Sequence, residues 1–247
     1  MNKLTTIYYH DIVDDGKGDS YQRTEISKFE AQMRYLKENG YNTILFEDLK
    51  KGLPKRPVLV TFDDGFSSIF NKAVPVMRKY GIKGNVFLPT KYIEENNKHY
   101  MSWEQIKQLI QEGDFSVAAH THSHVDIRTQ DRSHLQSEVR KSDNLIDKNL
   151  SVKNSSFCMP YGKYNSVSIK LLKEVSNYCY FFASHYGQID EKNVSKHLIP
   201  RIGISNDDTI EIFAKKLNGK LNWKGWIQRI RLLIANIRKE RITQYDI

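Results

Sequence analysis

The 247-residue sequence contains only two cysteines, Cys158 and Cys179. Small secreted folds held by disulfides need more, so nothing points to an oxidising compartment. No stretch reaches the roughly 18 consecutive apolar residues of a membrane-spanning helix. The N-terminal residues lack the apolar run and small-residue cleavage site of a signal peptide. We therefore expect a cytoplasmic protein without a membrane span.

Acidic residues are also fewer than basic ones, with 29 Asp and Glu against 38 Lys and Arg, which gives a net charge of +9. This excess favours anionic partners but says little about the fold. Nucleic-acid binding would rest on charge alone, so we expect none. The length allows one or two domains, and a single α/β barrel of about 200–250 residues would use nearly all of it.

Short runs typical of strands alternate with segments of helical periodicity. One helical face carries Ile26, Phe29, Met33 and Leu36 at steps of three and four. This alternation predicts a mainly parallel sheet with helical crossovers, and periodicity alone leaves a (β/α) barrel and a doubly wound sheet open. The predicted strands are 4–9, 43–46, 57–62, 84–88, 115–119, 156–159, 180–183 and 198–204, and further helices are predicted at about 67–80, 103–112, 133–149 and 207–217.

Two of these helices begin at capping-box patterns, in which a Ser is followed three residues later by a Gln. The first pair is Ser102 and Gln105, and the second is Ser133 and Gln136. We found neither an internal repeat nor a low-complexity tract.

The first cluster with chemical potential is Thr61-Phe62-Asp63-Asp64-Gly65, at the end of the most apolar predicted strand. Adjacent carboxylates at a strand end point to different sides, so one could bind a metal while the other acts as a base. Gly65 permits the tight turn that exposes them. Taken alone, the same residues also fit an ordinary turn.

The second cluster places three histidines within five residues, His120-Thr121-His122-Ser123-His124, directly after another predicted strand. His120 and His124 are four residues apart, and on one side of a helical turn their ring nitrogens could converge on one ion. Imidazole and carboxylate together suit zinc and its neighbours. The middle His122 would face away, and a solvent-exposed polar loop is the alternative.

The third cluster is Phe157-Cys158-Met159-Pro160-Tyr161-Gly162, which ends a predicted strand and begins a turn where Pro160 could hold the Tyr161 amide towards a cavity. By itself it is equally a structural turn. All three clusters follow predicted strands, however, and the carboxyl ends of strands are where α/β folds build their sites.

At these residues the chain resembles the polysaccharide deacetylase family, whose catalytic unit is the NodB homology domain (carbohydrate esterase family 4). The family motif T-F-D-D-G is matched by residues 61–65, its H-[ST]-x-x-H by residues 120–124, and a Pro-Tyr-Gly turn by residues 160–162. The resemblance covers about residues 4–217 and implies a distorted (β/α) barrel, often with seven strands.

The resemblance also implies roles for individual residues. Asp64, His120 and His124 would bind a divalent metal, with Zn²⁺ as the family-like choice and Co²⁺ or Ni²⁺ as alternatives. Asp63 would be the general base, and the Tyr161 amide would help to stabilise the oxyanion.

The sequence departs from the family pattern in two places. Many members carry an arginine at the start of the third motif, next to the base; this chain has none there, and Arg201 is our candidate substitute. Many also use a late histidine as general acid. The motif is missing here, and we rank His10 first, ahead of His185 and His197.

Residues 219–247 are predicted to form a basic amphipathic helix after a catalytic domain at 1–218. Its apolar residues, from Trp223 to Ile237, recur at steps of three and four, and its basic residues, including Arg238, Lys239 and Arg241, lie mostly elsewhere around the helix. Such a helix can lie in the interface of an anionic membrane, here at the inner face. The alternative is packing on the barrel or on a partner subunit.

We therefore expect a metal-dependent hydrolase that removes N-acetyl or similar small acyl groups from an amino sugar, in a glycan or in a lipid- or nucleotide-linked glycan precursor. A formyl group is an open alternative to acetyl. The rival hypothesis is a non-catalytic glycan-binding module on a decayed deacetylase scaffold, which the missing arginine and missing late histidine motivate.

Overall fold

The protein is described by a computed structural model over residues 2–19 and 22–245, with side chains described up to residue 237. The strands are β1 (Lys3–Tyr9), β2 (Asp11–Val13), β3 (Arg23–Glu25), β4 (Asn42–Thr43), β5 (Pro57–Phe62), β6 (Gly84–Leu88), β7 (Phe115–Ala119), β8 (Ser156–Cys158), β9 (Tyr180–Ala183), β10 (Gln188–Asp190), β11 (Ile199–Pro200) and β12 (Ile202–Gly203). The helices are α1 (Ile26–Glu38), α2 (Val74–Tyr80), α3 (Thr90–Glu94), α4 (Trp103–Gln111), α5 (Arg132–Leu150), α6 (Ser166–Val175), α7 (Ile210–Leu217) and α8 (Trp223–Tyr245), with short helical turns η1 (Phe46–Lys50), η2 (Ile69–Ala73), η3 (Ile127–Thr129), η4 (Pro160–Gly162) and η5 (Glu191–Asn193).

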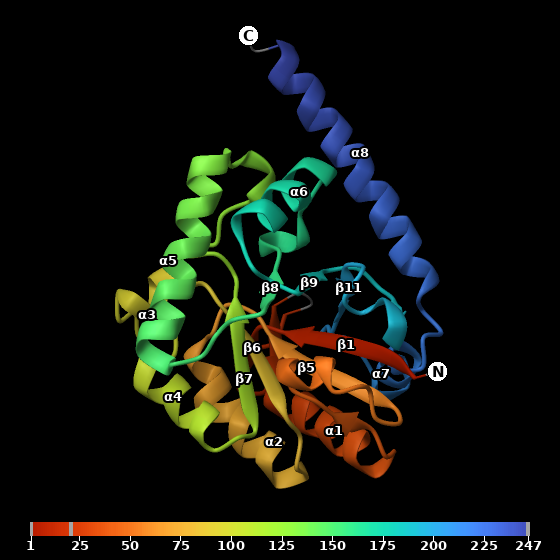
Figure 1. Ribbon diagram of the computed structural model, residues 1–247. Helices are drawn as coiled ribbons and strands as arrows, with labels where there is room; N and C mark the ends of the chain where they lie inside the picture. The colour runs from red at the N-terminus through yellow and green to blue at the C-terminus, as the bar shows by residue number, and fades with distance from the viewer. Residues whose placement is uncertain (1, 20–21, 246–247) are drawn as a thin grey trace.

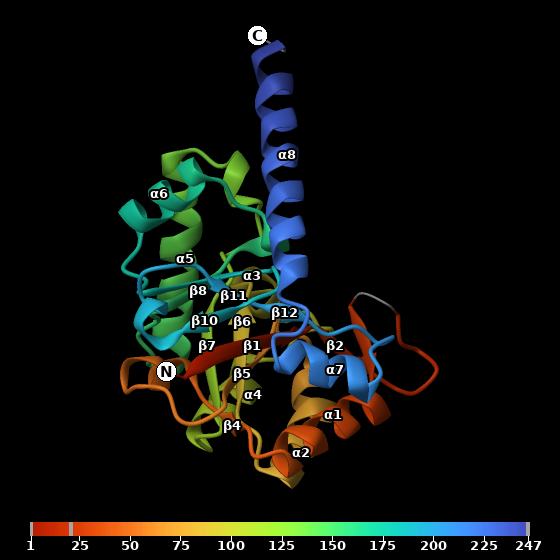
Figure 2. The ribbon, with the colours of Figure 1, turned by 90° about the vertical axis from the view of Figure 1, so that its right-hand side faces the viewer.

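The main sheet curls into a barrel of parallel strands in the order β1-β5-β6-β7-β8-β9-β11. The ring is closed by one short segment, because β11 pairs with β9 on one side and the directly following β12 pairs with β1 on the other. Figures 1 and 2 show helices packed around this ring. With β11 and β12 counted as one position, the described residues form seven ring positions, which confirms the distorted (β/α) barrel.

The barrel has an inner and an outer apolar core, because successive side chains of a strand face opposite sides. Inward residues of six strands form one buried cluster: Leu59, Phe87, Ala118, Cys158, Phe182 and Ile199. Their outward neighbours, such as Val58, Val86 and Val117, form a second cluster with the helices. The inner core is closed at the amino end of the strands by Phe46, whose ring lies 4.9 Å from Phe87 and 5.4 Å from Phe182.

Several predicted elements have the predicted bounds, namely strands 57–62, 84–88, 115–119 and 180–183. The capping box at Ser102 is also confirmed, since its hydroxyl accepts the Gln105 amide and Gln105 caps in return. The box at Ser133 is wrong: Asp131 is the cap of α5, and its carboxylate accepts the His134 amide at 2.8 Å.

Other predicted bounds are wrong for a visible physical reason. The strand predicted at 43–46 ends at Thr43, because Phe46 turns into the barrel as part of η1. The strand predicted at 198–204 breaks at Arg201, where the chain changes its partner from β9 to β1. The helix predicted at 67–80 has the predicted bounds, since helical residues run without a break from 67 to 80 and η2 is a π-helical turn within them. The helix predicted at 207–217 begins later, at Ile210, after the cap Thr209.

Helix α8 begins next to the first residue of β10, since Asn222 donates to Gln188. It extends well beyond the barrel in both views (Figures 1 and 2). Within the described residues, no helix combines the length and apolar character needed to cross a membrane. The predicted division of the chain at residue 218 stays a prediction.

The inner core yields a stability prediction. Phe182→Ala is expected to lower the free energy of unfolding by about 3–5 kcal/mol, because the removed ring leaves a cavity inside the barrel. Val167→Ala on α6, where the side chain is exposed, should change it by less than about 0.5 kcal/mol. Urea unfolding of both variants measures the difference, and equal values would mean that the barrel interior is not tightly packed.

Candidate active site

A pocket of about 260 Å³ opens at the carboxyl ends of the barrel strands. It gathers residues from all three sequence clusters, together with the strand β1 region and the segment after β9. Its lining residues are Tyr8, His10, Gln22, Asp63, Asp64, His120, His124, Tyr161, Gly162, Lys163 and Ser184.

Strand alternation explains how polar side chains reach this pocket. Beyond the apolar inner core, the next inward positions at the strand ends are polar, so the same face of each strand changes from core to site. Four residues of the site follow an inner-core residue by an even number of positions: Asp63 follows Leu59, His120 follows Ala118, Ser184 follows Phe182, and Arg201 follows Ile199.

Asp63 and Arg201 form a buried, bidentate ion pair beneath the pocket. The two guanidinium nitrogens donate to the two carboxylate oxygens at 2.6 and 2.8 Å. Asp63 is 4% exposed and Arg201 is 1% exposed. Arg201 also donates to the Ser184 hydroxyl at 3.0 Å, and its guanidinium carbon lies 4.6 Å from the centre of the Tyr8 ring. The expected arginine partner of Asp63 is therefore supplied from the break between β11 and β12.

This pairing sets the charge of Asp63. Burial alone would raise the pKa of the carboxyl, but the Arg201 guanidinium outweighs it and holds the pKa of Asp63 well below its usual range. Asp63 is thus ionised at neutral pH and can accept a proton from a group bound in the pocket.

Asp64, His120 and His124 converge on one point with their potential ligand atoms within 4.8 Å of one another. The Asp64 carboxylate oxygen lies 3.4 Å from His124 Nε2 and 3.9 Å from His120 Nε2. One carboxylate and two imidazoles form a donor set for zinc and similar cations, and three protein ligands leave room for water and substrate.

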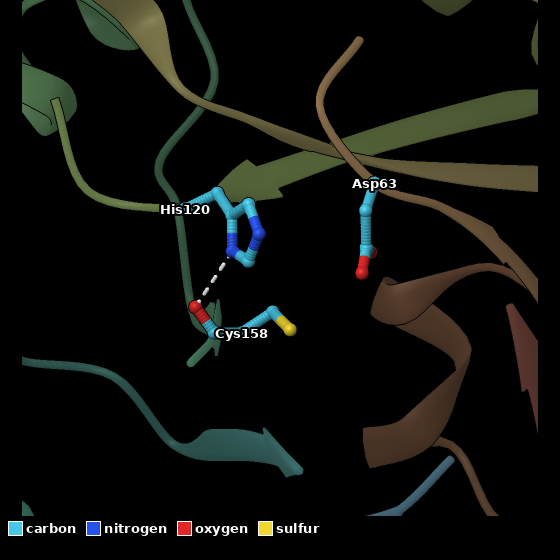
Figure 3. A group of neighbouring side chains, drawn as sticks. All are labelled: Asp63, His120 and Cys158. Carbon is cyan, nitrogen blue, oxygen red and sulfur yellow. Dashed lines mark hydrogen bonds between the residues drawn. The ribbon is translucent and has the colours of Figure 1, made fainter. Parts of the chain in front are cut away.

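The orientation of His120 is fixed from the opposite side of its ring. Figure 3 shows the hydrogen bond from His120 Nδ1 to the carbonyl oxygen of Cys158, at 2.8 Å. A carbonyl only accepts, so Nδ1 carries the proton and Nε2 offers its lone pair to the pocket. Burial lowers the pKa of His120 to about 3, which keeps the ring neutral.

Asp64 has the opposite electrostatic situation to Asp63. Burial and the neighbouring Asp63 charge raise the pKa of Asp64 to about 7 in the absence of a cation. A bound cation would relieve this repulsion, so the site favours binding of positive charge at Asp64.

A second ligand group, Asp63, His120 and Cys158, overlaps the first (Figure 3). Two of its members already have other partners, since Asp63 is paired with Arg201 and the Nδ1 atom of His120 donates to the Cys158 carbonyl. Burial also raises the pKa of the Cys158 thiol well above its usual value, which keeps it protonated. We therefore assign the cation to Asp64, His120 and His124.

Several residues of the site have a left-handed backbone conformation. Four of the seven non-glycine residues with positive φ in the described ranges lie here: Asp64, Thr121, His124 and Tyr161. Positive φ is costly for a β-branched residue such as Thr121, and strained residues of this kind concentrate at functional sites. The expected helical turn between the two histidines is wrong, because these left-handed residues, and not a helix, bring the rings together.

The remaining predicted residues are placed as follows. His10 lines the pocket with its Nε2 atom 3.9 Å from Asp63, and burial lowers its pKa. Tyr161 adopts φ 59°, and its ring, 60% exposed, lies 4.4 Å from that of His124. His122 faces away, as expected, with its ring nitrogen 3.0 Å from the Thr90 hydroxyl.

Sequence reasoning missed three residues that support the site. These are Cys158, through its carbonyl, Ser184, through its hydroxyl, and Glu138 of α5. The Glu138 carboxylate accepts hydrogen bonds from both the amide and the hydroxyl of Ser123 at 2.7 Å, and so holds the loop between His120 and His124 in place. No local pattern marks them, since a backbone carbonyl has no sequence signature and Glu138 lies on another element.

Comparison with known proteins agrees with this geometry. The sequence profile of the polysaccharide deacetylase family matches residues 50–179, slightly more than half of the chain. The Bacillus subtilis (strain 168) protein YxkH is 34% identical over 174 residues, which cover 68% of this chain and 60% of that protein. A poly-beta-1,6-N-acetyl-D-glucosamine N-deacetylase of Staphylococcus aureus (strain MRSA252) is 28% identical over 214 residues, covering 78% of this chain and 71% of that protein.

Solved structures show the same barrel. A polysaccharide deacetylase from Bacillus cereus is 26% identical and superposes with a TM-score of 0.77, covering 87% of this chain and 69% of that one. The Streptococcus pyogenes deacetylase PplD, solved with acetate, is 22% identical with a TM-score of 0.79, covering 87% and 98%. At that identity the second likeness concerns the fold alone.

The ligand assignment predicts a pH-dependent cation site. Purified protein should hold about one divalent ion per chain, and its affinity should fall about tenfold for each pH unit below about 7, because the ion must displace the proton of Asp64. Metal analysis and zinc titration between pH 5 and 8 test this. The Asp64→Ala/His120→Ala variant should lose the ion while His122→Ala keeps it, and equal metal content in all three would refute the assignment.

The ion pair between Asp63 and Arg201 predicts that loss of Arg201 lowers the stability of the fold in a pH-dependent way. Arg201→Gln should destabilise the fold by about 3–5 kcal/mol at pH 7, because it leaves the Asp63 charge buried and unpaired. The loss should shrink as the pH falls towards 4, where Asp63 in the variant can protonate. Unfolding at several pH values measures it. Asp63→Asn/Arg201→Gln, which removes both charges, should recover most of the loss, and a loss independent of pH would contradict the pairing.

Proposed function

The chain belongs to the polysaccharide deacetylase family, and we propose that it is a metal-dependent hydrolase that removes N-acetyl or similar small acyl groups from an amino sugar. The observation that carries the proposal is the pairing of two neighbouring carboxylates in one pocket. Arg201 keeps the Asp63 carboxylate ionised, so that it can act as a base, and Asp64 joins two histidines in a cation site.

The donor set of Asp64, His120 and His124 fits zinc, and cobalt or nickel would suit the same ligands. When bound, such an ion supplies Lewis-acid polarisation of the acyl carbonyl and lowers the pKa of water.

Asp63 is the general base of the proposal. Its low pKa keeps it ionised, and its place in the pocket beside the cation ligands puts it within reach of an attacking water. Arg201 fills the carboxylate's lower side, holds it in one orientation and leaves its remaining acceptor capacity towards the pocket. The Tyr161 amide, held by the turn after Pro160, is our candidate oxyanion donor.

His10 is our candidate proton donor to the leaving amine. Its Nε2 atom lies 3.9 Å from Asp63 in the same pocket. Because burial lowers its pKa, His10 is neutral at rest and would donate only after taking up a proton during the reaction. The adjacent Asp63 charge favours its protonated form.

For the substrate, we propose an acylated amino sugar within a glycan or a glycan precursor. A pocket of about 260 Å³ fits the acylated group of one sugar unit, and the exposed Tyr161 at its rim offers an aromatic surface to a neighbouring unit. The name of the Staphylococcus aureus relative points to N-acetylglucosamine as the first sugar to test. The chain spans about 60% of YxkH, so the activity of the whole relative is not carried over.

One of the two observations that favoured the rival hypothesis, a pure glycan-binding module, no longer supports it. It depended on the missing arginine, and Arg201 now stands against Asp63. A binder has no use for a buried ion pair that keeps a carboxylate charged beside a cation site.

The activity test uses a panel of N-acetylated and N-formylated amino sugars and β-1,6-linked N-acetylglucosamine oligomers, with acetate or formate release as the readout. Asp63→Asn should lower kcat by about 10²–10⁴-fold, because it removes the base. It should still bind the ion through Asp64, and His122→Ala serves as the matched control with near-normal rate. Absence of acyl release from the whole panel by the zinc-loaded protein would refute the proposal.

A further inference from the structure

Helix α8 contacts the barrel through its small and polar residues. Gly225 is buried, and a Cβ built on it would lie 1.9 Å from the Tyr186 carbonyl oxygen, so only glycine permits this approach. Gln228 accepts the Tyr186 amide at 2.7 Å, and Asn236 donates to the Tyr164 carbonyl at 2.9 Å. These positions are three, eight and eleven residues apart, which places them on one packed face of the helix.

Six of the large apolar side chains of α8 lie on the other side. We call them the apolar stripe: Trp223, Trp226, Ile230, Leu233, Ile234 and Ile237, which are 37–70% exposed. Their steps of three and four place them on one face, turned away from the packed face. Figure 2 shows α8 standing clear of the barrel along much of its length. Packing on the barrel, the alternative kept open from the sequence, therefore does not cover these residues.

Six large apolar residues in one continuous stripe differ from the scattered apolar residues of an ordinary surface. Single exposed leucines need no explanation, but a contiguous patch marks a contact with another surface. The two tryptophans at the start of the stripe are of the type enriched where an apolar phase meets water.

The charges around the stripe select the partner. Lys224, Arg229 and Arg231 flank it on both sides, and residues 219–237 contain no Asp or Glu. A second copy of the same helix would bring these cations together, which is unfavourable. An anionic lipid surface would accept the apolar stripe and attract the flanking cations at the same time. Arg238, Lys239 and Arg241, also predicted for this helix, lie beyond the described side chains.

We propose that α8 docks on an anionic lipid surface through the apolar stripe. The docked helix also fixes where the pocket lies. Tyr186 and Tyr164, which bond to α8, continue the segments of Ser184 and Tyr161 that line the pocket. These two bonds therefore tie pocket-lining segments to the docked helix. The consequence that the glycan substrate is presented at a membrane rests on the proposed function, whereas the docking itself does not.

The test is co-sedimentation of the full chain with vesicles of phosphatidylglycerol and phosphatidylcholine, against vesicles of phosphatidylcholine alone. Leu233→Glu within the stripe should weaken binding to anionic vesicles at least tenfold. Val167→Glu on α6 is the matched control, because this side chain is also exposed and the change in charge is the same. Arg229→Gln/Arg231→Gln should weaken binding about tenfold or more and flatten its dependence on salt.

Three outcomes would overturn the proposal: no sedimentation of the wild type, equal binding of the stripe and control variants, or equal binding to both kinds of vesicle. A concentration-dependent dimer that Leu233→Glu dissociates, without vesicle binding, would assign the stripe to a second copy instead. Circular dichroism and metal content verify that each variant is folded. Acyl release from a soluble substrate should be unchanged by Leu233→Glu, so failure of docking and failure of the catalytic proposal are measured separately.

Discussion

A single buried ion pair, between Asp63 and Arg201, joins the architecture of the barrel to the chemistry of its pocket. Asp63 follows β5, and Arg201 occupies the break between β11 and β12, the segment that closes the ring. Two charges removed from water are stabilising only when their geometry is good, and here both carboxylate oxygens are matched by guanidinium nitrogens. The residues that close the barrel are thus the residues that set the charge of the base.

The same pair separates the properties of two adjacent aspartates. Asp63 lies on the inward face of its strand and meets Arg201, which lowers its pKa. Asp64 is one residue further, and its left-handed backbone at φ 68° turns its carboxylate towards the histidines, where burial and Asp63 raise its pKa to about 7. A carboxylate of high pKa is a poor free anion and a good partner for a cation. Division of labour between identical side chains therefore follows from position alone.

Much of this could be predicted from sequence where the signal is local. Strands β5, β6, β7 and β9 are short apolar runs with clear ends, and the residues of the metal group lie directly after two of them. The strand predicted at 198–204 was wrong because its pairing depends on contacts with residues far away in the sequence. The strand break at Arg201 exists because the chain changes its pairing partner there, and the family profile ends at residue 179, before this residue. The cap at Asp131 displaced the one predicted at Ser133, because Asp and Ser are both favourable N-cap residues and only the geometry shows which one begins the helix.

The positions of the histidines also narrow the choice of the residue that donates a proton to the leaving amine. Of the three histidines considered, His10 alone lines the pocket. His185 is buried but does not line the pocket, and its ring nitrogen lies 3.4 Å from the Tyr186 carbonyl. His197 is exposed just before β11, at the amino end of the strands and thus at the opposite end of the barrel from the pocket. A histidine that delivers a proton to the leaving amine has to reach the same small space as Asp63. By position, His10 meets this condition, and its low resting pKa means that the proton it donates must first come from the reaction itself.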